Sequence, residues 1–102
     1  MTLKISRPIH PGEYLREEYL KPLGLSAGKL AMALNLNRTR IERLAAEEID
    51  LTPDTAARLA AYFDTTPDFW MNFQTSYDLA LIARDKKLAK ELAAIAERSH
   101  AA

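Results

Sequence analysis

The residues of this chain best suited to bind a ligand lie between positions 38 and 43. This short stretch carries three arginines, one threonine and one glutamate around a single isoleucine. An arginine guanidinium can donate two hydrogen bonds to O6 and N7 of a guanine, and it can also clamp a phosphate. These side chains therefore favour non-covalent recognition of a nucleic acid.

Two short helices joined by a tight turn would hold these side chains in place. Ser26 is a good N-cap for a helix to about Leu34, and Asn37 is a good N-cap for a second helix to about Ala46. Between them, Asn35 stands where the turn needs a positive φ, which asparagine tolerates better than most residues. The segment from about Ser26 to about Ala46 therefore predicts a helix-turn-helix.

The periodicity of the second helix decides which side chains face outward. At 100° per residue, Ile41, Leu44 and Ala45 cluster on the inner side, and Ala31 is small enough for the two helices to cross closely. Lys29 would lie beside backbone phosphate, and Arg38 lies in the first turn of the helix that would enter the major groove. A helical hairpin with a solvated charged face would show the same residue types, so that alternative stays open. We expect the contacts with DNA from seven residues: Lys29, Asn37, Arg38, Thr39, Arg40, Glu42 and Arg43.

The rest of the chain also predicts helices. It contains no valine, and the alternating runs typical of strands are absent. Thr52-Pro53-Asp54 and Thr66-Pro67-Asp68 each combine a hydroxyl cap, a first-turn proline and an acid near the positive end of a helix. We expect an all-α fold in one domain, residues 1–102. It would have a loose arm at Met1–Ile9, further helices at about 11–20 and 53–63, and dimerisation and C-terminal helices within about 67–98.

Composition argues against several classes of protein. There is no cysteine, and no apolar run approaches the roughly 18 residues that cross a bilayer. The N-terminal stretch lacks a signal-peptide core, so a cytoplasmic protein without a membrane partner is the default expectation. A phosphate loop and a nucleophile–histidine–acid set are both absent, which predicts no enzyme and no cofactor. His10 and Glu13 would make only half a metal site, so we expect no metal and a capping or packing role for His10.

The formal net charge of zero hides a polarised chain. Between Met1 and Ala46, eight basic residues stand against four acidic ones. From Glu47 to Ala102, six basic residues stand against ten acidic ones. A basic front half suits DNA, and an acidic rear half suits a basic partner.

Two apolar stripes could serve the core or an interface. Aromatic residues recur at helical spacing near the start of the helix expected at 67–84, and they could fill the core, form a two-fold dimer interface or do both. A dimer would set two recognition helices about 34 Å apart, matching successive major grooves. The tail stripe is expected to pack on its own domain, with a dimer or a partner as the alternatives. The dimerisation residues expected are Phe69, Trp70, Phe73, Tyr77 and Leu81, and the tail stripe contains Leu81, Leu88, Leu92 and Ile95.

A series of motifs between about Pro8 and Leu81 resembles the HigA-type antitoxins, a branch of the Xre-family helix-turn-helix proteins. Each motif alone is weak, but together they follow the order and spacing of that family. They are His10-Pro11-Gly12-Glu13 with Leu15-Arg16-Glu17-Glu18 and Pro22-Leu23-Gly24-Leu25-Ser26; Leu51-Thr52-Pro53-Asp54-Thr55-Ala56 with Arg58-Leu59-Ala60; and Thr66-Pro67-Asp68-Phe69-Trp70-Met71-Asn72-Phe73-Gln74 with Tyr77-Asp78-Leu79.

The resemblance implies a fold and a function. The fold is a lambda-repressor-like five-helix helix-turn-helix domain, followed here by a C-terminal helical extension. The implied protein is a homodimer that binds operator double-stranded DNA to repress its own operon. It also neutralises a HigB-type toxin, an endonuclease that cuts mRNA on the ribosome, by direct binding.

One stretch departs from the family pattern. After the recognition helix, relatives usually carry a glycine-and-basic turn against the DNA backbone, whereas this chain has Ala45-Ala46-Glu47-Glu48-Ile49-Asp50. Acids near phosphate would weaken binding through repulsion and lost counterion release, unless the loop points away from the duplex. Two other interpretations therefore stay open: an antitoxin that only binds protein, and a stand-alone Xre-type repressor.

Overall fold

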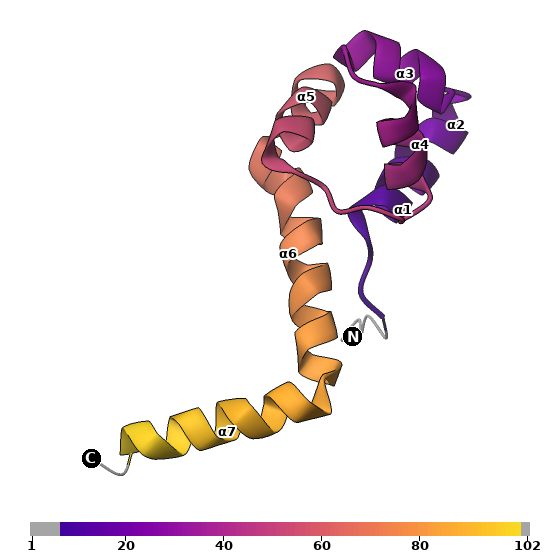
Figure 1. Cartoon of the computed structure of the whole chain (residues 1–102). Coiled ribbons are helices and arrows are strands. Elements are labelled where there is room, and N and C mark those ends of the chain that lie inside the picture. Colours follow the sequence, from indigo (N-terminus) through magenta and orange to yellow (C-terminus); the bar gives the residue numbers. More distant parts are fainter. Residues whose placement is uncertain (1–6, 101–102) are drawn as a thin grey trace, which may run out of the picture.

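The computed structural model describes residues 7–100, and every regular element among them is a helix. The part of the expected N-terminal arm before Arg7, which includes Lys4, lies outside the described residues. Figure 1 shows a compact group formed by the helices up to α5, a long α6 leaving it, and α7 at a steep angle to α6. The all-α prediction is confirmed. The helices are α1 (Pro11–Leu15), η1 (Arg16–Leu20), α2 (Lys21–Leu23), α3 (Ala27–Leu34), α4 (Arg38–Ala45), α5 (Pro53–Phe63), α6 (Pro67–Arg84) and α7 (Lys86–His100).

The first three elements form one continuous helix, because the residues at their junctions keep right-handed helical φ and ψ. Its middle turn, η1, is π-helical and lies just before Pro22. In a regular α-helix the proline ring would clash with the carbonyl of Glu18, and a wider turn relieves that contact. The helix therefore continues past the expected end near Leu20 and stops at Gly24, whose φ of 60° is left-handed.

The predicted helix-turn-helix is formed by α3 and α4. The Ser26 hydroxyl accepts a hydrogen bond from the Lys29 amide at 3.1 Å, and the Asn37 side chain accepts one from the Thr39 amide at 2.7 Å. Asn35 has a φ of 57°, as the turn requires. The three predictions that rest on local backbone chemistry are confirmed.

The next two helices begin as their Thr-Pro-Asp sequences predict. The hydroxyls of Thr52 and Thr66 accept hydrogen bonds from the amides of Thr55 and Phe69, at 3.3 and 3.1 Å. Each proline occupies the first turn. These caps fix where α5 and α6 begin, and so fix the positions of their buried faces.

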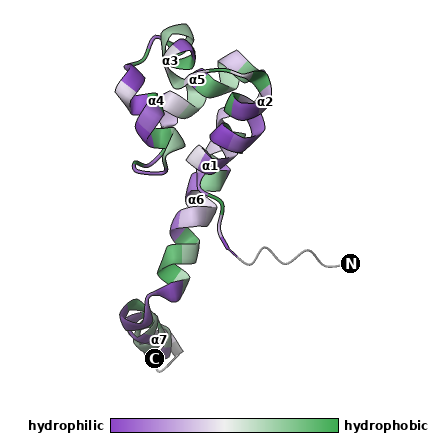
Figure 2. Cartoon of the chain, turned by 90° about the vertical axis from the view of Figure 1, so that its right-hand side faces the viewer, coloured by the Kyte–Doolittle hydropathy of each residue, from purple (hydrophilic) through white to green (hydrophobic). Residues whose placement is uncertain are grey.

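A single hydrophobic cluster holds α1, η1 and α3 to α6 together, while α7 extends beyond it (Figure 2). Trp70 lies at its centre with no exposed surface, and its indole N–H donates to the Thr65 hydroxyl at 2.8 Å. The assignment of Trp70 to a dimer interface is therefore wrong, because its own subunit already surrounds it. The other largest fully buried side chains are Leu15, Leu30, Ile41, Leu44, Leu59 and Pro11.

The expectation that the tail stripe packs on its own domain is also wrong. Leu92 and Ile95 of α7 are 48% and 55% exposed, and Leu81 of α6 is 47% exposed. One residue, Asp85, separates α6 from α7, and its backbone is extended. Two helices need a connection of about two to five residues to fold back side by side, so α7 points away instead.

Candidate nucleic-acid interface

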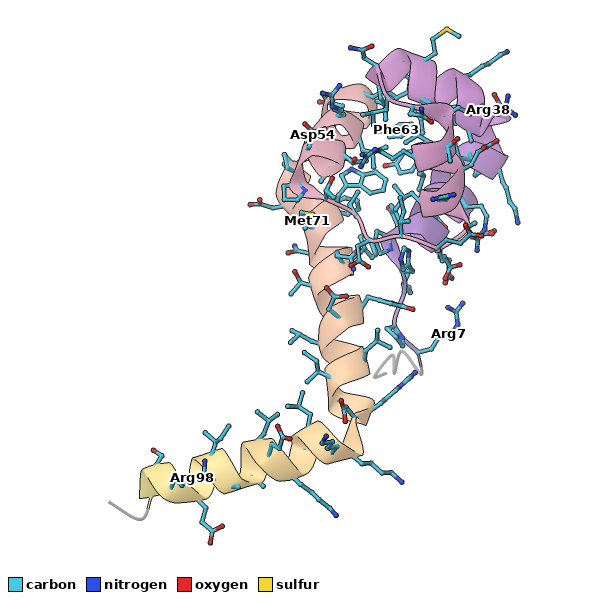
Figure 3. All side chains as sticks on the ribbon, in the orientation of Figure 1. Arg7, Arg38, Asp54, Phe63, Met71 and Arg98 are labelled. Atoms are coloured by element: carbon cyan, nitrogen blue, oxygen red, sulfur yellow. The ribbon has the colours of Figure 1, made fainter. Side chains whose placement is uncertain are left out.

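The seven residues expected to contact DNA are all exposed, and most of them lie on the outer side of α4. Ile41 and Leu44 face the core with 0% and 1% exposure, which turns the polar side of α4 outward. Figure 3 shows Arg38 at the outer edge of the helical group. The exposed residues are Lys29, Asn37, Arg38, Thr39, Arg40, Glu42 and Arg43.

One arginine of this surface is held by a neighbour on the same helix. The Nε of Arg38 lies 2.9 Å from a carboxylate oxygen of Glu42, and its methylene groups pass the backbone of Gly28. Both partners are largely exposed, so the pair contributes well under about 1 kcal/mol. The guanidinium is therefore oriented in advance yet free to exchange Glu42 for a phosphate or a base.

A residue of α5 braces the turn between α3 and α4. The Arg58 guanidinium donates to the carbonyls of Leu34 and Asn35, at 2.8 and 3.4 Å, and to the Asp54 carboxylate at 2.7 Å. These carbonyls end α3 and have no partner within the helix. Sequence reasoning missed this role, because the contact joins residues more than 20 positions apart.

A glycine of α1 sets the position of α4 from the other side. A Cβ on Gly12 would lie 1.7 Å from the carbonyl oxygen of Leu44, a backbone atom that no side-chain rotation can move. The two helices can therefore approach this closely only with glycine at position 12. The family motif contained this residue, but its spacing alone gave no reason for it.

Two of the three acidic residues in the loop after α4 accept hydrogen bonds within the chain, although all three residues are exposed. Arg16 donates to the carbonyl of Ala45 and lies 3.0 Å from the Glu47 carboxylate. The hydrogen bond of Arg16 to Glu17, which has the larger effect, and its hydrogen bond to Glu47 both raise the pKa of Arg16. Asp50 accepts a hydrogen bond from Gln74 at 3.3 Å. Two of the three acids thus have donors within the chain, so less negative charge is left to face a phosphate than the sequence suggested.

The buried amide of Gln74 connects this loop to α6. Its carbonyl oxygen accepts from the Leu51 amide at 2.7 Å, and its NH₂ group donates to Asp50 and Asp78. Because Gln74 is only 4% exposed, these bonds fix the path of the chain from α4 to α5. Only the presence of a glutamine on an apolar helix face could have indicated this role in advance.

Four of the five residues expected at a dimer interface keep exposed surface on α6. Phe69, Phe73 and Tyr77 are half-buried, and Leu81 is exposed. The expected capping and packing role of His10 is confirmed, because its Nδ1 accepts a hydrogen bond from the Gly12 amide at 2.9 Å and its ring meets Tyr77 edge-on at 4.9 Å. Residues 7–100 contain no cluster of three or more potential metal ligands. Over the same residues, every helix is too short or too polar to cross a membrane.

Two crossed helices with a left-handed turn and an outward arginine face define the class of helix-turn-helix proteins. The helix-turn-helix family model matches residues 17–70. Virulence-associated protein I of Dichelobacter nodosus is 52% identical over 79 residues, which are 78% of this chain and 73% of that protein.

Two solved structures are similar over most of the chain. One is Pseudomonas aeruginosa antitoxin HigA with the higBA promoter, at 41% identity and a TM-score of 0.78, covering 83% of this chain and 94% of the other. The second is antitoxin GraA in complex with its operator, at 38% identity and a TM-score of 0.79, covering 92% and 93%. The chain belongs to the helix-turn-helix family, in its HigA-type antitoxin branch, which is not a class of enzymes.

Proposed function

We propose that this chain is the antitoxin of a type II toxin–antitoxin module. As a homodimer it binds operator DNA and represses its own operon, and by direct binding it neutralises a HigB-type toxin. The observation that carries the proposal is the exposed arginine face of α4, braced by Gly12 on one side and by Arg58 on the other. The similar HigA and GraA structures hold a promoter and an operator, which supports DNA as the ligand of this face.

The proposed contacts divide into two kinds. Arg40 and Arg43, with Thr39 and Glu42, face the base edges of the major groove, because they lie on the outward side of α4. Lys29, Asn37 and Arg38 lie at the starts of α3 and α4, where amide groups and cations meet backbone phosphates.

The proposed dimer uses α6. In its second half this helix has apolar residues on every side, including Leu79, Leu81 and Ile82, each at least 42% exposed. A cluster of large exposed apolar side chains of this kind marks a contact surface, and a second copy of the chain would cover it. A two-fold pair would present two α4 helices to successive major grooves of a palindromic site.

The proposed toxin contact rests on charge and on the family. The acidic surplus after Glu47 suits a basic partner. Because the proposed target is genomic DNA, we place the protein in the cytoplasm.

The test is a gel shift with the DNA upstream of the gene, combined with co-purification of a tagged neighbouring small protein. Arg43→Ala should weaken operator binding by about 1–3 kcal/mol, or about 5- to 160-fold. Lys90→Ala removes one positive charge from the far end of the molecule and should leave binding unchanged. An equal shift for wild type and Arg43→Ala at fixed salt would remove Arg43 from the interface.

The same experiment separates two other functions. Glu48 remains exposed beside α4, which favours an antitoxin that has lost DNA binding. In that case the neighbour co-purifies while no shift occurs even at low salt. A stand-alone repressor would give the shift without the neighbour.

A further inference from the structure

The chain carries an apolar groove along α6. Its volume is about 600 Å³, and the N-terminal segment at Arg7–Ile9 forms one wall. The floor is made by one face of α6, with aromatic rings at its start and small side chains towards its end. The α6 residues that line the groove are Phe69, Asn72, Phe73, Ser76, Ala80, Ala83 and Arg84.

The same chain carries an unpaired apolar stripe on α7. Leu92 and Ile95 are largely exposed, and Leu88 is half-buried near the start of the helix. Figure 3 shows α7 extending away from the rest of the chain, with Arg98 near its far end. Burial of these apolar side chains would lower the free energy of the protein, so we expect the stripe to contact another apolar surface.

The groove and the stripe match in spacing and in size. Leu88, Leu92 and Ile95 of the stripe recur four and three positions apart. The same spacing is found in the groove, at Phe69, Phe73, Ser76, Ala80 and Ala83. This spacing is the one at which side chains of one helix fit between those of another. Ser76 and Ala80 are small and leave room on the face of α6, while α7 offers leucine and isoleucine, so large side chains meet small ones.

Helix α7 cannot lie in the groove of its own chain. Only Asp85 lies between α6 and α7, and a side-by-side helix pair needs about two to five connecting residues. A short joint of this kind favours exchange of an element between two copies. A second copy covers both surfaces at once, since each chain has one groove and one stripe.

We propose that α7 of one copy lies in the α6 groove of a second copy, and the reverse, so that two arms are exchanged across the dimer. This inference rests on the proposed homodimer and specifies its contacts. Arg84 lines the groove and Glu91 lies at the edge of the stripe, so the pairing allows one ion pair across the contact. The exchanged arm buries Leu92 and Ile95, which one chain alone leaves in water.

The test uses introduced cysteines, because the chain has none of its own. Two full-length chains with different tags, one carrying Ala80→Cys and the other Leu92→Cys, are mixed and oxidised. The arm exchange predicts a disulfide between the two tags, in excess of 80–80 and 92–92 pairs. Lys90→Cys in place of Leu92→Cys is the matched control, since it lies on the opposite side of α7 and should not cross-link.

A second variant measures the strength of the contact. Leu92→Glu should weaken self-association at least about 10-fold in sedimentation, while Lys90→Glu should not. Leu92 is outside the hydrophobic core, so circular dichroism should show both variants folded.

The outcomes separate this inference from the proposed function. A wild-type dimer with no 80–92 cross-link, and with self-association unchanged by Leu92→Glu, overturns the arm exchange and leaves DNA binding intact. A cross-link that forms only after the toxin is added shows that α7 responds to the toxin, and this result also overturns the arm exchange. A gel shift that fails while the 80–92 cross-link forms rejects the proposed operator binding alone.

Discussion

The same substitution at two glycines should have opposite effects on stability. Gly12→Ala places a methyl group against the carbonyl of Leu44, whereas Gly28→Ala places one 3.5 Å from the Cδ of Arg38. The first neighbour is backbone of the recognition helix, and the second is a flexible, exposed side chain. The pair therefore tests whether Gly12 sets the spacing between α1 and α4.

The magnitudes follow from these contacts. At position 12 the new methyl group would lie 1.7 Å from an oxygen, so α1 and α4 must separate by more than about 1 Å. Overpacking of this kind costs about 1–3 kcal/mol or more, and the better helix propensity of alanine offsets less than about 1 kcal/mol. At position 28 the contact is an ordinary one, so only the propensity gain of up to about 1 kcal/mol remains.

The assay is unfolding by heat and by urea, followed by circular dichroism. A loss of about 2 kcal/mol for Gly12→Ala corresponds to a fall in Tm of about 8–16 °C in a domain of this size. Gly28→Ala should raise Tm by a few degrees. If Gly12→Ala unfolds at or above the wild-type temperature, the close approach of α1 to α4 is refuted.

Two further perturbations test single contacts. Arg58→Ala removes the donor to the carbonyls of Leu34 and Asn35, so it should lower the free energy of unfolding, measured in urea, by about 1–2 kcal/mol. Arg58→Lys should recover part of this loss. Equal stability of the wild type and both variants would show that Arg58 does not brace the turn. The hydrogen bonds from Arg7, at 2.6 and 2.8 Å, lower the pKa of Glu13 below its ordinary value of 4.5. The ion pair therefore stabilises the fold fully above pH 4.5, and this stabilisation is lost as the pH falls through the lowered pKa. Glu13→Gln should therefore be less stable than wild type at pH 7, with a difference that closes in acid, and a difference independent of pH would contradict the ion pair.

Local backbone chemistry explains what the sequence could predict. The caps at Ser26, Asn37, Thr52 and Thr66 act within three residues, and Asn35 needs only its own φ. Such contacts depend on neighbouring positions, so the starts of four helices and the turn could be placed without coordinates.

The missed features all depend on distant parts of the chain. Arg58 meets Leu34, and Arg16 meets Glu47, across 24 and 31 positions. Gly12 is needed only because α4 crosses α1 at that point. No local rule reports such contacts, because they exist only once the helices are packed.

The two wrong predictions have one cause. Trp70 and the tail stripe both lie on amphipathic helices, and periodicity shows that a face is apolar without showing what covers it. Trp70 is covered by its own subunit, whereas the stripe around Leu92 is turned away by the joint at Asp85. Which part of the molecule buries an apolar helix face is decided by the tertiary structure.

The most direct test of the central claim, that the outer face of α4 binds operator DNA, is a hydroxyl-radical footprint on the upstream DNA. Two α4 helices in successive major grooves should protect two regions about one helical turn apart, and this protection should disappear when Arg40 and Arg43 are both replaced by alanine in a chain that still folds. Protection that persists in this double variant, or its absence with wild-type protein at low salt, would contradict the claim.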